Sequence, residues 1–73
     1  MKANELIKVV GEEVRILFYD LNSEYYLRSA DYETEATAYF WKEHSINKLC
    51  NYNVIKVHVY ENRLYITVVK DGE

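Results

Sequence analysis

The sequence predicts an α+β domain with elements in the order α-β-β-α-β-β, in which a four-stranded, mainly antiparallel sheet is packed on one face by helices. Apolar residues at helical spacing open the chain, alternating apolar residues follow them, and two β-branched runs close the chain. Such elements form a core by burying their apolar sides against one another. With 73 residues, the whole of 1–73 is expected to form a single small domain.

A short helix is predicted over about Lys2–Val10. Its apolar residues recur at intervals of three and four, so they share one side: Ala3, Leu6, Ile7 and Val10. Gly11 follows as a candidate C-cap, because a residue without a Cβ adopts positive φ at little cost.

The next two segments are predicted to pair as a β-hairpin. Residues 13–19 and 24–29 have the composition of strands, and Asp-Leu-Asn-Ser at 20–23 is typical of a turn. The side chains expected to point into the core are Val14, Ile16, Phe18, Tyr25 and Leu27.

A second helix is predicted over about Asp31–His44. Ser29 or Asp31 would cap it, because a short oxygen side chain satisfies free backbone N–H groups there. Glu33 and Glu35 would then fall in its first turns, where the helix dipole favours negative charge. Its core-facing stripe is expected to be Tyr32, Ala36, Tyr39 and Phe40.

Trp41 projects onto a different, uncharged side of this predicted helix. It is therefore either exposed, or buried against the first helix or the segment 45–53. That segment is interpreted as a polar connection from which Ile46, Leu49 and Cys50 tuck under the core as one helical turn.

The last two segments form the clearest pattern. Residues 54–60 and 63–70 are β-branched runs joined by Glu61-Asn62, which suits a two-residue turn. This turn pairs Tyr60 with Arg63 and sets the register. The pairs on the apolar face are then Val59/Leu64, Val57/Ile66 and Ile55/Val68, and those on the mixed face are Tyr60/Arg63, His58/Tyr65, Lys56/Thr67 and Val54/Val69.

Composition excludes several classes of protein. Two glycines cannot build a glycine-rich phosphate loop, and the single cysteine, Cys50, forms neither an intramolecular disulfide nor a multi-cysteine metal site. No apolar run approaches the length that crosses a bilayer. We expect a protein of the reducing cytoplasm that carries no metal and no cofactor.

The ionisable residues do not predict catalysis. Cys50 with His44 or His58 could in principle form a nucleophile–base pair, but no local signature supports it. The sequence therefore predicts a protein that is not an enzyme, with no catalytic residues.

Two kinds of binding surface remain. On the mixed face of the last hairpin, cations alternate with aromatic rings, as in single-stranded nucleic-acid sites. The residues of this alternative are Lys56, His58, Tyr60, Arg63 and Tyr65. The formal charge of −3 and the pI of 5.3 oppose it, because dedicated phosphate binders are usually basic.

The other surface would bind a protein. Eight tyrosines and one tryptophan exceed what the core needs, and such side chains are enriched at interface hot spots. An exposed Trp41 would either dimerise the chain or dock a partner. The acidic residues near the start of the predicted helix could face a basic groove on that partner. The predicted partner-binding residues are Trp41, Glu24, Asp31, Glu33, Glu35, Tyr60 and Tyr65.

Four stretches resemble small proteins encoded by phages and mobile elements of low-GC Gram-positive bacteria. They are residues 2–9, residues 14–20, and the closing segments 54–60 and 64–68. The resemblance implies a genomic setting in which small, acidic, aromatic-rich proteins look like inhibitors of host defence, anti-CRISPR proteins among them. The leading hypothesis is accordingly a non-enzymatic inhibitor of a host nuclease or defence complex in the host cytoplasm, and the alternative is a nucleic-acid-binding regulator.

Overall fold

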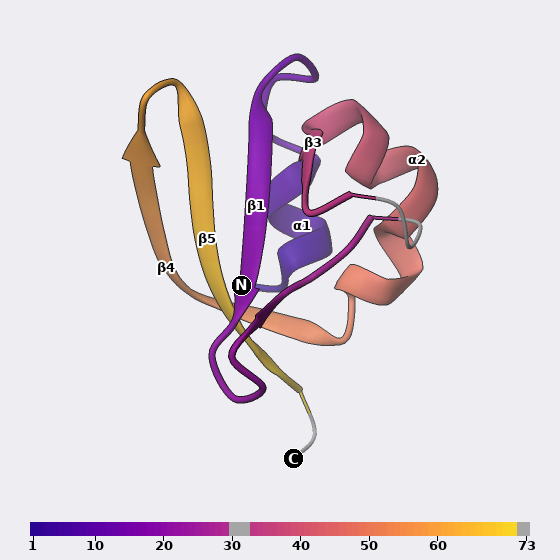
Figure 1. Cartoon of the computed structure of the whole chain (residues 1–73). Coiled ribbons are helices and arrows are strands. Elements are labelled where there is room, and N and C mark those ends of the chain that lie inside the picture. The colour runs from indigo at the N-terminus through magenta and orange to yellow at the C-terminus, as the bar shows by residue number, and fades with distance from the viewer. Residues whose placement is uncertain (30–32, 72–73) are drawn as a thin grey trace.

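Within residues 1–29 and 33–71, which the computed structural model describes, five strands form one mixed sheet with two helices packed on one face (Figure 1). The strand order is β2-β1-β5-β4, and β3 also pairs with β1. The elements are α1 (Ala3–Ile7), β1 (Arg15–Asp20), β2 (Tyr25–Tyr26), β3 (Glu35–Thr37), α2 (Ala38–Leu49), β4 (Tyr52–Tyr60) and β5 (Arg63–Lys70). The predicted α+β class is confirmed.

The strand pairing differs from the predicted four-stranded, mainly antiparallel sheet. β1 runs parallel to β5, from Arg15 beside Arg63 to Asp20 beside Val68, and the short β3 adds a strand that the sequence does not predict. β5 lies in the interior of the sheet, with β1 on one side and β4 on the other. Ile66 and Val68 are buried on the helix-covered side, and the residues at 63–65, 67 and 69 are half-buried.

The predicted first helix and first hairpin are present in shorter form. α1 ends at Ile7, and Gly11 is not its C-cap; the carbonyl of Gly11 accepts a hydrogen bond from the Val14 N–H at 3.0 Å instead. β1 and β2 pair antiparallel, as predicted. Leu27 is buried, but Tyr25 is 72% exposed, so half of the expected inward pair is wrong. The reason is that β2 is a two-residue strand at the edge of the sheet.

α2 begins seven residues later than predicted, at Ala38 rather than Asp31. Thr37 caps it by accepting a hydrogen bond from the Phe40 N–H at 3.3 Å. Glu35 lies in β3 and not in a first helical turn, because residues 35–37 pair with the free side of β1. Ser29 pairs with Glu33 in a β-bridge, and Asp31 and Tyr32 lie outside the described residues.

The buried stripe of α2 is not the predicted one. The helix continues to Leu49, and its buried residues are Ala38, Trp41, Ser45 and Leu49. Tyr39 is 51% exposed and Cys50 is exposed as well, so neither belongs to the core. Ala36 is buried, but in β3.

The closing hairpin has the predicted turn and most of the predicted register. Glu61 and Asn62 both adopt positive φ, and the pairs from Tyr60/Arg63 to Lys56/Thr67 are confirmed. A bulge at Ile55 then shifts the strand by one residue, so that Val54 and not Ile55 faces Val68. An extra residue on one strand is what produces such a shift.

Candidate binding surface on the open sheet face

One face of the sheet carries no helix among the described residues, and we call it the open face (Figure 1). Residues in register share a face, and Ile16, Phe18 and Ile66 are buried beneath the helices, so their strand neighbours point the other way. In the paired strands, the side chains of the open face are Arg15, Leu17, Tyr19, Tyr26, Glu35, Thr37, Asn53, Lys56, His58, Tyr60, Arg63, Tyr65, Thr67 and Val69.

The register orders these side chains into rows that cross the sheet. One row runs from Arg15 through Arg63 to Tyr60. The next runs from Leu17 through Tyr65 to His58, and the third from Tyr19 through Thr67 to Lys56. Cations therefore lie at opposite corners of the surface, and aromatic rings lie between them.

Glu35 joins the two arginines. The Arg63 Nε–H donates to Glu35 Oε2 at 2.8 Å, and Arg15 Nη1 lies 3.6 Å from the same oxygen. This hydrogen bond and the charge of the carboxylate raise the pKa of Arg63 above its ordinary value. The pair holds both guanidinium groups at fixed places on the open face, because Arg15 and Arg63 are also neighbours in the parallel ladder.

Aromatic rings cover much of the remaining area. Tyr19 and Tyr26 meet edge to face, with ring centroids 5.2 Å apart. Tyr60 is 57% exposed on β4, whereas Tyr65 is half-buried on β5 between the neighbouring strands. The open face thus offers flat, partly solvent-exposed rings at both edges and at the centre of the sheet.

The charge of this face is opposite to that of the whole chain. Three cations, Arg15, Lys56 and Arg63, stand against one carboxylate, Glu35, whereas the chain carries 12 acidic and 9 basic residues. Most of the acidic residues of the chain therefore lie outside the open face. Locally, the open face is attractive to anions.

All five residues predicted for nucleic-acid binding lie together on the open face. Lys56, His58 and Tyr60 are exposed, and Arg63 and Tyr65 are half-buried. Sequence reasoning missed Arg15, Tyr19 and Tyr26. The alternation of Arg15 and Tyr19 with buried residues of β1 was a usable signal, but nothing in the sequence placed β1 beside β5.

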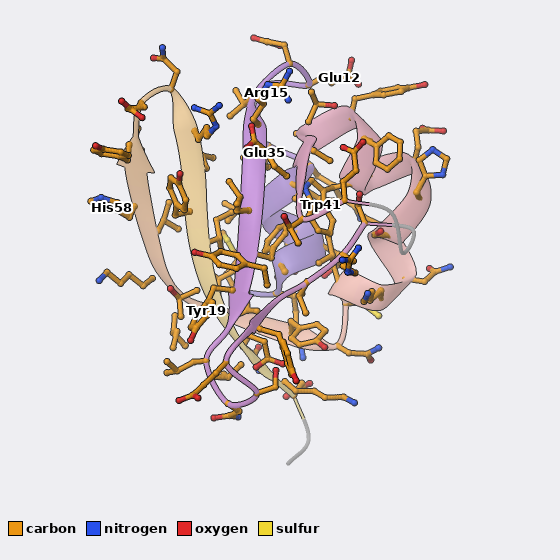
Figure 2. All side chains as sticks on the ribbon, in the orientation of Figure 1. Glu12, Arg15, Tyr19, Glu35, Trp41 and His58 are labelled. Carbon is orange, nitrogen blue, oxygen red and sulfur yellow. The ribbon has the colours of Figure 1, made fainter. Side chains whose placement is uncertain are left out.

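The residues predicted for protein binding are not brought together. Trp41 is fully buried, and Figure 2 shows it between β1 and α2. Its indole Nε1–H donates to the Ile16 carbonyl at 3.0 Å, and its ring meets that of Phe18 at a centroid distance of 4.8 Å. Of the two alternatives that the sequence leaves open for Trp41, exposed or buried, the structure shows the buried one.

The predicted acidic cluster is also dispersed. Glu24 lies in the turn beyond the C-terminal end of β1, whereas Glu35 pairs with Leu17 nearer its start. Glu33 is exposed in the β-bridge to Ser29, and Asp31 lies outside the described residues. Of the predicted partner-binding residues, Tyr60, Tyr65 and Glu35 share the open face.

The part of the chain that the structure describes contains no group of three metal-ligating side chains and no pocket. None of its helices is long and apolar enough to cross a membrane. The Cys50 thiol donates to the Asn47 carbonyl at 2.9 Å, and the His44 ring packs against Phe40. Cys50 and His44 therefore each contact a neighbouring residue of α2.

The sequence matches no known family model, and neither the curated proteins nor the solved structures contain a significant match. Function is therefore inferred from the residues themselves.

Proposed function

We propose that this chain is a binding protein that holds single-stranded nucleic acid on the open face. The observation that carries the proposal is the gathering of Tyr19, Tyr26, Tyr60 and Tyr65 with three cations on one uncovered sheet surface. Single-stranded nucleic acid is bound in this way elsewhere, by bases stacked on aromatic rings and phosphates held by cations.

The rows across the sheet suggest a path for the strand. Bases would stack on Tyr60 and Tyr65, whose strands are adjacent, while Lys56 and the Arg15–Arg63 pair would contact phosphates on either side of them. Glu35 restrains both guanidinium groups, so little side-chain entropy would be lost when they meet a phosphate. Because most of the contacts are to rings and phosphates, little sequence preference is expected.

The net charge of −3 limits long-range attraction to a polyanion. Binding would therefore depend on short-range contacts and would weaken moderately with salt. Three phosphate contacts predict a slope of about −2 for log K against log salt concentration, since each contact to a single strand contributes roughly −0.7.

A salt titration with a fluorescent oligonucleotide of about 12 nucleotides tests the proposal, starting at about 50 mM salt. Lys56→Ala should weaken binding and reduce the slope by about 0.7. Lys8→Ala is the matched control, because Lys8 is an exposed lysine at the end of α1, and it should leave the slope unchanged. Absence of wild-type binding at the lowest salt, or equal effects of the two substitutions, would contradict the proposal.

The second candidate is the predicted inhibitor of a host protein. Its support is the composition of the open face, because tyrosine and arginine are the side chains most enriched at interface hot spots. The partner would present an acidic surface, and a host nuclease or defence complex, met by a phage or mobile-element protein in the host cytoplasm, remains the specific version of this proposal.

Affinity capture from nuclease-treated lysate separates the two candidates. A protein retained by the wild type and by Tyr39→Ala, but lost with Tyr60→Ala, would favour the protein partner. Tyr39 and Tyr60 are suited to this comparison because they are 51% and 57% exposed on different elements. Capture that occurs from untreated lysate and is lost after nuclease treatment would favour the first candidate.

A further inference from the structure

The outer half of β4 is exposed on both of its sides. Every residue from 55 to 60 is solvent-exposed, including Ile55, Val57 and Val59 at 51%, 48% and 64%. Val57 and Val59 pair with Ile66 and Leu64, so they lie on the helix-covered side of the sheet. The helices do not reach them, because β4 leads away from α1 and α2 toward the hairpin turn (Figure 1). Nucleic acid on the open face would leave these valines uncovered.

Val57 and Val59 also carry the backbone N–H and C=O groups that face outward at the free edge of β4. The Tyr60/Arg63 pair closes a two-residue turn and is hydrogen-bonded, so the pairs alternate from there along the ladder. The N–H and C=O groups of Tyr60, His58 and Lys56 therefore face β5, and those of Val57 and Val59 face outward. The start of β4 is already occupied, since the Val54 N–H donates to the Met1 carbonyl at 2.8 Å.

We propose that a second copy of this chain pairs with this edge, antiparallel, about a two-fold axis at His58. In this register Val57 of one copy faces Val59 of the other, and both valines of both copies enter hydrogen-bonded pairs. An axis at Val57 would instead use the bulge at Ile55, and an axis at Val59 would use the turn at Glu61. The axis at His58 alone uses regular strand.

Charge supports the antiparallel arrangement. The free segment carries Lys56 near one end and Glu61 at the other, with His58 midway between Val57 and Val59. Antiparallel pairing brings each Lys56 opposite the partner's Tyr60 and next to the partner's Glu61. A cation beside a ring and a carboxylate is attractive, whereas parallel pairing would bring like charges together.

The pairing is self-limiting. It consumes the β4 edge of both copies, and the opposite edge of the sheet is made of β2 and β3, strands of two and three residues that offer little backbone for further addition. The product is a closed dimer in which the two open faces join across β4 into one surface. The dimer does not depend on the proposed nucleic-acid binding, so either can fail without the other.

Disulfide trapping tests the register. In a Cys50→Ser background, which removes the exposed native thiol, His58→Cys puts two thiols on the axis. The Cα atoms of such a non-hydrogen-bonded pair are about 4.5 Å apart, within disulfide range. With oxidised glutathione as the oxidant, a disulfide-linked dimer is expected.

Lys56→Cys in the same background is the control. Its two thiols would be separated by four residues along the paired strands, about 13 Å, which is too far for a disulfide. A mixture of Lys56→Cys and Tyr60→Cys chains should cross-link again, because those positions face each other. Equal cross-linking of the His58→Cys and Lys56→Cys proteins would overturn the proposed register.

Sedimentation tests the association itself. The wild type should shift from monomer to dimer as its concentration rises toward about 1 mM, the range expected of a small interface. Val59→Lys should remain monomeric and keep the wild-type circular dichroism, because Val59 is 64% exposed in the single chain. A wild type that stays monomeric at the highest concentration would overturn the proposal.

Discussion

Trp41 links α2 to the sheet through one hydrogen bond and one aromatic contact. Its indole N–H satisfies the Ile16 carbonyl of β1, and its ring packs against Phe18 of the same strand. Sequence reasoning left its burial open, because the apolar stripe was projected onto a helix taken to begin at Asp31 rather than at Ala38. Its true neighbours on the buried stripe include Ser45, a polar residue that conceals the apolar pattern.

We expect Trp41→Phe to lower the free energy of unfolding by about 1–3 kcal/mol, because it removes the buried hydrogen bond from the indole to the Ile16 carbonyl and leaves a cavity where the larger ring packed. Urea denaturation followed by circular dichroism measures this. Tyr39→Phe, at an exposed position of the same helix, should change stability by no more than about 0.5 kcal/mol. An equal effect of both substitutions would mean that Trp41 is not buried as described.

Tyr52 gives the molecule an alkaline sensitivity. Burial raises the pKa of its phenol, and the charge of Asp20 raises that pKa further. A raised pKa in the folded state means that the unfolded chain loses this proton first. The contribution of Tyr52 is therefore fully present below the ordinary tyrosine pKa of about 10 and is lost as the pH rises through the folded value.

Unfolding free energies measured by urea from about pH 8 to pH 11 should thus fall less for Tyr52→Phe than for the wild type. Tyr25→Phe, which alters a 72% exposed ring, is the control and should follow the wild-type curve. A steeper fall for Tyr52→Phe would contradict the assignment.

The boundary between β3 and α2 shows where pattern reading fails at the scale of an element. Residues 31–37 contain acids and capping residues that suit a helix start, yet residues 35–37 extend and pair with β1. The signal present in the sequence was Thr37, a good N-cap residue directly before a long helical run. The free edge of β1 that attracts β3 is a tertiary feature, and no local pattern reveals it.

The effect of Thr37→Ala on stability distinguishes a helix that begins at Ala38 from one that begins at Asp31. Thr37→Ala should destabilise the fold by about 0.5–2 kcal/mol if Thr37 is the cap that accepts from the Phe40 N–H. In the interior of a helix beginning at Asp31, the same change would stabilise, because alanine is the better helix former. Thermal denaturation followed by circular dichroism reports the sign directly.

At the scale of the whole molecule, the closing hairpin was predictable almost to the residue, and the arrangement of the strands was not. The Glu61-Asn62 turn sets the hairpin register locally, so sequence spacing sufficed as far as the bulge. The parallel β1–β5 pair joins residues almost fifty positions apart, and spacing carries no information about it. The candidate site follows the same division: its β4–β5 half was predictable, and its β1 half was not.

The central claim is that the open face binds single-stranded nucleic acid. A titration of ¹⁵N-labelled protein with an oligothymidine of about eight nucleotides, followed by amide chemical shifts at about 50 mM salt, tests it most directly. The largest shifts are expected at Lys56, His58, Tyr60 and Tyr65, with little change across α1 and α2. A spectrum unchanged at saturating oligonucleotide, or shifts concentrated on the helices, would contradict the claim.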